Sequence, residues 1–399
     1  MTNSPDTDRV IDRAEEAAGA GGAESVRHSV RLRRDWLADP DTVTLDVGYR
    51  ITREADGHRI AARLGAHELF LDEPVRLAPV TVPKPWGREL WLTGVEARGE
   101  SGVHTGAGVL PLSQYLALAP RRLTAGAPLV LLKVLDPSPQ PVLGDLYFEA
   151  HEAKREVYVV SHVDPDAWPA GRGGIRFGMN QELRRRYGDD DAFRRDYLAA
   201  VRRYEAVRRA IDDGDASRAA AEAELRAAME AFVNLRELAV GDVVVVPTWL
   251  PHSLQHGVRV IEFQTPSYER YIISFAQKVL TQPHWDTETA VARMRLDLPE
   301  PPRFAPVADG AERIVSFDDF GVWRITLSPG AAFPLPDHPS YALCMVVQGK
   351  LGLGSLRLIA EEAAFVPAAA LEPARRDGRA TPANDGEQPA VILLAAPGL

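Results

Sequence analysis

Two short segments of the chain combine histidine and carboxylate side chains at spacings that suit a metal ion. The first contains Glu149 and His151, two residues apart, and Glu156 a few residues later. If Glu149 and His151 lie on one strand, their side chains project from the same face. The polar residues 152–155 favour a turn, after which the apolar run at 157–160 would bring Glu156 back to the neighbourhood of His151. The sequence therefore predicts that these three side chains converge.

The second segment supplies a further histidine. Gly241 and Asp242 precede the apolar run Val243–Val246, Pro247 and a tight turn, and His252 stands at the exit of that turn. Two histidines and two carboxylates that meet inside a β-barrel suit a divalent ion such as zinc, iron or manganese. We therefore predict one metal site formed by His252 and the three residues of the first segment.

Composition narrows the ligand types and excludes several classes of protein. The 399 residues include one cysteine, Cys344, which excludes an internal disulfide and cysteine-rich zinc or iron–sulfur sites. The 46 basic and 56 acidic residues give a net charge of −10. This charge disfavours nucleic-acid binding, which requires many basic side chains to neutralise phosphates. The longest apolar runs fall far short of the roughly 20 residues needed to cross a bilayer, and the acidic N-terminus does not read as a signal peptide. We expect a cytoplasmic protein without a membrane span.

The elements that must position the metal site are mainly β-strands. Short apolar runs between glycine and proline turns predict strands before residue 180 and again from residue 241. Between them the apolar spacing becomes helical, which indicates an inserted helical segment. We expect an N-terminal tail with a short β segment at residues 1–79, a metal-binding domain at 80–300 with its helical insertion at 180–237, and a second small β domain at 304–399.

The two metal-site segments resemble the two sequence motifs of the cupin superfamily. Gly144–Glu156 resembles the first motif, a glycine followed by His-x-His and a glutamate, with Glu149 where the first histidine usually stands. Gly241–His252 resembles the second motif, a glycine, five residues, a proline and then a histidine, with Trp249 where a glycine is usual. On these two motifs the chain resembles the cupins.

Within the cupins, the chain is similar to the type I mannose-6-phosphate isomerases over about residues 80 to 395. The shared motifs are Trp86-Gly87, Leu132-Lys133-Val134-Leu135-Asp136, Lys154-x-Glu156, Pro251-His252, and Glu262-Phe263-Gln264 leading to Arg270. The resemblance implies a mainly β fold of two cupin (jelly-roll β-barrel) domains, with an α-helical insertion between the two motifs of the first. It also implies a C-terminal cupin domain that has lost its metal.

The resemblance assigns a role to each matching residue. It makes Glu149, His151, Glu156 and His252 the metal ligands, Lys154 and Arg270 catalytic residues, and Lys133 a residue that binds substrate. Glu149 replaces a glutamine of the family's pattern. Two anionic ligands would neutralise a divalent ion and favour manganese or iron, although zinc is the ion that the resemblance implies first.

The activity that the resemblance implies is the interconversion of an aldose and a ketose through an enediol. The substrate would be a sugar phosphate such as mannose 6-phosphate or fructose 6-phosphate. Glu152, Lys154 or a carboxylate outside the metal site could move the proton, and the sequence leaves this choice open. An iron-dependent cupin oxygenase and a non-catalytic, sugar-binding cupin are the alternatives.

The C-terminal β domain lacks the histidines that a second cupin metal site would need. Pro336 and His338 stand where two histidines are expected, and Glu372 stands where a third is expected. Cys344 lies in an apolar strand pattern, which indicates a buried side chain rather than a nucleophile. We therefore expect a structural C-terminal domain, in a protein that is a monomer or a homodimer.

Overall fold

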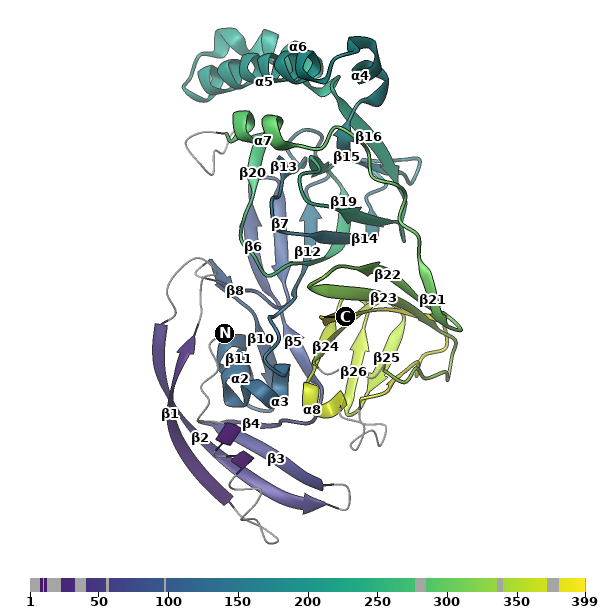
Figure 1. Ribbon diagram of the computed structural model, residues 1–399. Helices are drawn as coiled ribbons and strands as arrows, with labels where there is room; N and C mark the ends of the chain where they lie inside the picture. The colour runs from purple at the N-terminus through teal and green to yellow at the C-terminus, as the bar shows by residue number, and fades with distance from the viewer. Residues whose placement is uncertain are drawn as a thin grey trace. The chain divides into compact units, whose positions relative to one another are not determined.

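The chain forms two compact units (Figure 1). The computed structural model describes residues 8–9, 11–12, 23–32, 41–54, 57–96, 98–276, 285–335, 340–371 and 380–398. Unit 1 consists of Met1–Thr81, Trp91–Lys133 and Arg303–Leu399, and unit 2 consists of Val82–Leu90 and Val134–Pro302.

Residues 91–133 belong to unit 1, whereas the sequence pattern predicts them in the metal-binding domain. The reason is a set of long-range strand pairs. Strand β5 (Val75–Ala78) pairs with β10 (Gly102–Thr105) on one edge and with β27 (Ala363–Val366) on the other. These pairs connect residues 91–133 to the C-terminal strands through hydrogen bonds that no local sequence pattern predicts.

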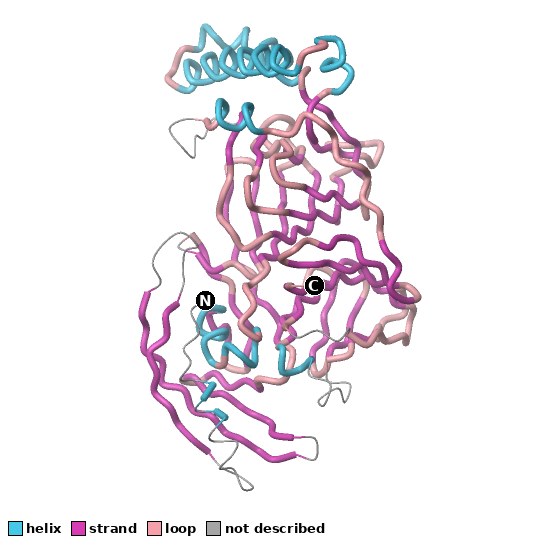
Figure 2. Tube along the Cα trace, in the orientation of Figure 1, coloured by secondary structure: helices cyan, strands magenta, loops and turns pink. Residues whose placement is uncertain are grey.

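Two sheets contain most of the strand residues of unit 2 (Figure 2). The order of the six-stranded sheet is β17 (Val243–Val246), β14 (Glu156–Val163), β19 (Val258–Gln264), β12 (Leu131–Pro137), β7 (Gly87–Trp91) and β6 (Val80–Lys84). The order of the five-stranded sheet is β16 (Val233–Leu238), β15 (Gly173–Met179), β18 (His252–Leu254), β13 (Phe148–Ala150) and β20 (Tyr271–Ser274).

The helices of unit 2 lie mostly between β15 and β16. They are α4 (Gln181–Tyr187), α5 (Asp190–Asp212), the 3-10 helix η1 (Ala216–Arg218) and α6 (Ala219–Glu230), and α7 (Thr287–Arg293) follows later in the chain. Helix α5 begins where the Asp189 carboxylate accepts hydrogen bonds from the backbone N–H groups of Asp191 and Ala192. Gly214, at φ +102°, then turns the chain shortly after the helix ends.

Helix α5 packs on the five-stranded sheet and leaves the other face of that sheet for the site. Its buried side chains are Phe193, Tyr197, Ala200, Val201, Tyr204 and Val207. They belong to one apolar cluster with Phe148 of β13. Because side chains alternate along a strand, Glu149 points to the face opposite Phe148. The apolar layer therefore fixes β13 from behind while its carboxylate faces the interior.

Unit 1 is also mainly β. Its N-terminal sheet consists of β1 (Ala23–Leu32), β2 (Asp41–Glu54), β3 (Gly57–Leu64) and β4 (His67–Phe70). The nine-stranded sheet has the order β11 (Gly108–Pro111), β10, β5, β27, β24 (Ala342–Gln348), β29 (Ala390–Pro397), β23 (Phe320–Leu327), β22 (Ala311–Ser316) and β21 (Ala305–Ala308). Smaller elements are β8 (Val95–Glu96), β9 (Gly99–Glu100), β25 (Lys350–Leu353), β26 (Leu356–Ile359), β28 (Pro382–Ala383), α2 (Leu112–Leu118), α3 (Pro120–Thr124) and α8 (Ala368–Leu371).

The C-terminal strands of unit 1 enclose an apolar core. Cys344 and Val346 of β24, Val366 of β27, and Ile392 and Leu394 of β29 all lie in one cluster and are at most 1% exposed. The positions of Pro336, His338 and Glu372 lie outside the described residues. No helix among the residues that the structure describes is both long enough and apolar enough to cross a bilayer.

Candidate metal centre

Three strands bring the predicted ligands together in unit 2. Strands β13 and β18 are antiparallel, and Glu149 is the register partner of His252. His151 directly follows β13, and the short segment 152–155 leads to Glu156, the first residue of β14. Cross-strand partners have Cβ atoms about 5 Å apart, so this register places side chains more than 100 residues apart in one cluster.

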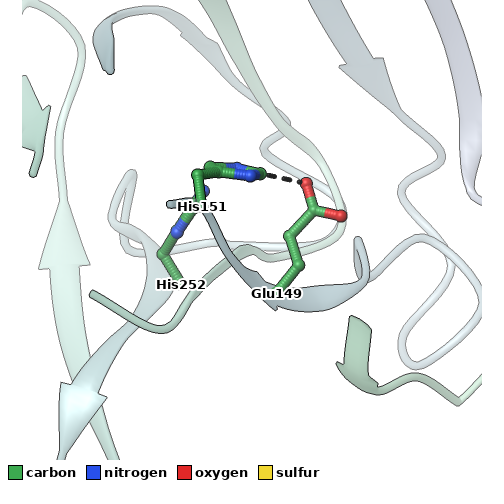
Figure 3. A group of neighbouring side chains, drawn as sticks. All are labelled: Glu149, His151 and His252. Carbon is green, nitrogen blue, oxygen red and sulfur yellow. Dashed lines mark ion pairs between the residues drawn. The ribbon is translucent and has the colours of Figure 1, made fainter. Parts of the chain in front are cut away.

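The ligand atoms lie within the reach of a single ion. Glu149, His151 and His252 each offer one atom, and these three atoms lie within 4.8 Å of one another (Figure 3). His151 Nε2 is 3.6 Å from Glu149 Oε1 and 3.5 Å from Glu156 Oε1. His252 Nε2 is 3.0 Å from Glu156 Oε2. The two histidines thus face both carboxylates.

Both imidazoles are oriented by backbone carbonyl groups. His151 Nδ1 lies 3.0 Å from the carbonyl oxygen of Glu269, and His252 Nδ1 lies 3.0 Å from that of Leu250. A carbonyl oxygen only accepts, so each Nδ1 carries the hydrogen and each Nε2 of a neutral ring keeps its lone pair. Metal-binding histidines in proteins are held in this way by a second hydrogen bond.

Two buried atoms of the cluster lack a hydrogen-bond partner, as is expected where a cation binds. His151 Nε2 and Glu149 Oε2 are buried and have no hydrogen-bond partner within the described part of the chain. A buried polar atom without a hydrogen-bond partner costs free energy, and a bound ion is one of the few explanations for it. Two imidazole nitrogens and two carboxylates match the donors that zinc, manganese and iron accept. These residues therefore fit a divalent metal.

Glu156 is the most heavily contacted residue of the cluster. Its Oε1 is 2.5 Å from Lys154 Nζ, and its Oε2 accepts a hydrogen bond of 2.6 Å from the Tyr158 hydroxyl. Burial would raise the pKa of the Glu156 carboxyl, but Lys154, His151 and His252 together hold it well below its usual value. Glu156 is therefore a carboxylate, the form in which it can bind a metal.

The two histidines have opposite pKa shifts. Burial, and next the charge of Lys154, lowers the pKa of His151 well below its usual value, so this ring is neutral. Burial also acts to lower the pKa of His252, but its hydrogen bond to Glu156 and the charges of Glu156 and Glu149 raise it overall. A proton and a metal ion would compete for His252 Nε2.

Arg270 and Lys154 are the cations that the structure places at the cluster. Arg270 Nη1 is 4.0 Å from Glu149 Oε2, and its guanidinium lies 4.9 Å from the centre of the Tyr147 ring. The Lys154 side chain is 9% exposed. Lys133 is half-buried on β12, two strands from β14 in the six-stranded sheet, and its contact with substrate stays a prediction.

Glu152 points to a different set of partners. Its carboxylate accepts a hydrogen bond of 2.9 Å from the Tyr271 hydroxyl and is paired with Arg293. His256, four residues after His252, also lies apart from the cluster: its Nδ1 is 2.8 Å from Asp145 Oδ1, and its ring stacks on Trp168.

Sequence reasoning assigned no site role to two residues of the site interior, Tyr158 and Glu262, although Glu262 belongs to the shared motif before Arg270. Tyr158 donates to Glu156, and Glu262 is its register partner on β19 and is 1% exposed. Burial, followed by the charges of Glu156 and Glu262, raises the pKa of Tyr158 well above its usual value, which keeps its hydroxyl protonated. The alternation of Glu156 with Tyr158 along β14 is the sequence signal that could have identified the tyrosine.

Trp249 has a backbone conformation that explains the glycine usual at this position in cupins. Its φ is +61°, in the left-handed region that favours glycine. Its N–H donates to the carbonyl oxygen of His151 at 2.6 Å, and its ring lies 5.0 Å from that of Tyr271. The strained turn thus ties the segment before His252 to the residue after β13.

Comparisons with known proteins identify the fold. No family model matches the sequence, and no curated protein matches it. Among solved structures, the mannose 6-phosphate isomerase from Bacillus subtilis is similar with a TM-score of 0.56 at 16% identity, covering 81% of this chain and 99% of that one.

Two further solved structures show the same likeness. The apo form of mannose 6-phosphate isomerase from Salmonella typhimurium has a TM-score of 0.58 at 14% identity, and a zinc-bound mannose 6-phosphate isomerase has 0.58 at 15%. Each match covers 82% of this chain and 100% of the other. The chain therefore has the mainly β, cupin-type fold of these proteins, as the sequence predicts.

Proposed function

We propose that the protein is a metal-dependent aldose–ketose isomerase that acts on a sugar phosphate such as mannose 6-phosphate. The observation that carries the proposal is the convergence of Glu149, His151, Glu156 and His252, with the cations Lys154 and Arg270 at the same cluster. The cupin-type fold shared with mannose 6-phosphate isomerases supports it.

The four ligands would hold one divalent ion, with zinc the first choice and manganese or iron the alternatives. When bound, such an ion stabilises negative charge that develops on the oxygens of neighbouring carbons. The chain itself would add a second positive group, since the Arg270 guanidinium is held beside Glu149 by that carboxylate and by the Tyr147 ring. A guanidinium suits either an enediolate or a phosphate oxygen.

Proton transfer between the two carbons requires a base outside the metal site. Glu152 is held by Tyr271 and Arg293, which leaves Lys154 and Glu262 as the candidates. Lys154 Nζ lies 2.5 Å from Glu156 Oε1, a position that suits a hydrogen-bond donor rather than a base. We therefore assign the base to Glu262, which is buried on β19 and lies opposite Tyr158 in register.

The first experiment is to measure the metal content of the purified protein together with its isomerase activity. We expect about one divalent ion per chain, and conversion of mannose 6-phosphate to fructose 6-phosphate that a chelator abolishes and an added ion restores. Reconstitution with zinc, manganese or iron in separate samples identifies the ion. A well-folded protein that binds none of the three ions would contradict the proposal.

Two other results would favour different functions. Oxygen consumption by the iron form, without isomerisation, would indicate a cupin oxygenase. Bound metal with no turnover of phosphorylated or neutral sugars would indicate a sugar-binding cupin.

Glu149→Gln restores the amide that the isomerase pattern has at this position. We expect this variant to weaken manganese binding more than zinc binding, because carboxylates suit manganese.

A further inference from the structure

Glu269 connects the two segments that carry most of the site. Its carboxylate accepts hydrogen bonds from three successive backbone N–H groups, those of Glu152 at 2.6 Å, Ala153 at 2.9 Å and Lys154 at 3.2 Å. Consecutive N–H groups that converge in this way form a concave site for an anion, and here the anion is a side chain of the same chain. Hydrogen bonds to a charged acceptor are stronger than neutral ones.

The backbone of the same residue orients a metal ligand. The carbonyl oxygen of Glu269 is the partner of His151 Nδ1 at 3.0 Å. Arg270, the next residue, reaches Glu149. One dipeptide therefore contacts the segment that follows β13, the imidazole of one ligand and the carboxylate of another.

The segment 152–154 contains no helix or strand of its own, although it lies between His151 and Glu156. Its shape decides how far Glu156 and Lys154 lie from His151. Arg155 is fixed separately, because its N–H donates to Thr265 Oγ1 at 3.1 Å and its carbonyl accepts from Thr265 N–H at 3.0 Å. The three N–H groups bound by Glu269 are thus the part of the segment that depends on one side chain.

We propose that Glu269 is a positioning residue of the metal centre, whose carboxylate holds residues 152–154 in the shape that brings His151, Lys154 and Glu156 together. The inference rests on the proposed metal site. It assigns Glu269 no contact with substrate. Residues that orient metal ligands typically change metal affinity about 10- to 100-fold when they are removed.

The test compares Glu269→Ala and Glu269→Gln with the wild type by Co²⁺ titration of the metal-free full-length protein. The absorption spectrum of bound Co²⁺ reports its ligand geometry directly. We expect Glu269→Ala to bind Co²⁺ about 10- to 100-fold more weakly and with an altered spectrum. Glu269→Gln keeps one acceptor oxygen, so its Co²⁺ affinity should lie between those of the wild type and Glu269→Ala. Glu237→Gln is the matched control and should bind like the wild type, because Glu237 is an exposed residue of β16 that pairs with Arg172 at 4.0 Å.

Hydrogen exchange of the metal-free protein separates this proposal from the proposed function. Loss of the carboxylate should speed amide exchange at residues 152–154 at least about tenfold, whether or not any metal binds, because those N–H groups lose their acceptor. Wild-type exchange rates at 152–154 in Glu269→Ala would overturn the proposal, and so would unchanged Co²⁺ affinity and spectrum. If Glu269→Ala fails to fold, Glu269→Gln carries both measurements. A wild type that binds no metal but shows the expected exchange would contradict only the metal site.

Discussion

The interiors of the two units differ in chemistry although both are enclosed by β-strands. In unit 2, β14 and β19 place Glu156, Tyr158, Glu262 and Gln264 in buried positions. In unit 1, β24 is buried on both faces by apolar side chains, with Cys344 in the centre. Buried charges cost free energy unless they are paired, and the apolar core carries no such cost. A strand scaffold can therefore be filled with apolar side chains for stability or keep polar side chains for chemistry. The C-terminal strands of unit 1 have the apolar filling, and unit 2 has the polar one.

The largest effect that this difference predicts is the loss of the metal in His252→Ala. We expect turnover to fall at least about 100-fold, because a catalytic metal contributes several kcal/mol and each 1.4 kcal/mol is a factor of ten. The thermal midpoint of the metal-free variant should stay close to that of the metal-free wild type. His162→Ala, at an exposed position further along β14, is the control and should retain metal and activity. Full activity in His252→Ala would remove this histidine from the site.

Leu394→Ala in unit 1 should have the opposite pattern. Leu394 is 1% exposed in the apolar cluster, and truncation of a buried leucine costs about 2–5 kcal/mol of unfolding free energy. We expect a lower thermal midpoint with unchanged metal affinity. Val391→Ala, on the same strand but only half-buried, should cost less. A change in metal affinity as large as that of a ligand variant would show that the two interiors are not independent.

The buried thiol of unit 1 gives a pH-dependent prediction. Burial raises the pKa of Cys344 from about 9 to about 12. The folded state therefore holds a proton that the unfolded state loses above pH 9, so this contribution to stability is present below pH 9 and declines as the pH rises toward 12. Between pH 8 and 10 the decline should be on the order of 1 kcal/mol.

Urea unfolding at pH 8 and pH 10 measures this contribution, with Cys344→Ala as the control that should lose less stability over the interval. A thiol reagent should label Cys344 in urea and leave it unmodified in the native protein at pH 8. Rapid labelling of the native protein would contradict the burial of this side chain.

The convergence of the three side chains proposed as ligands was predictable from the sequence, because their spacing decides it. Glu149, His151 and Glu156 lie within eight residues of one another, and strand alternation with one turn is enough to predict that they converge. The position of Glu269 was not predictable, since its contact with Glu152 joins residues 117 positions apart. The pairing of β5 with β27, which assigns residues 91–133 to unit 1, is equally non-local. Contacts of this kind depend on the whole fold rather than on any segment pattern.

The smallest predicted effect concerns the backbone at Trp249. An ordinary residue at φ +61° is strained by about 1–2 kcal/mol, and glycine is not. Trp249→Gly and Trp249→Ala both lose the ring contacts with Tyr271 and Arg293, so the difference between them isolates the backbone. We expect the glycine variant to be more stable than the alanine variant by about 1 kcal/mol, the reverse of their usual order. The same pair at Thr248, which does not have a positive φ, should follow the usual order. An alanine variant at position 249 that equals or exceeds the glycine variant in thermal midpoint would show that the turn before His252 is not strained.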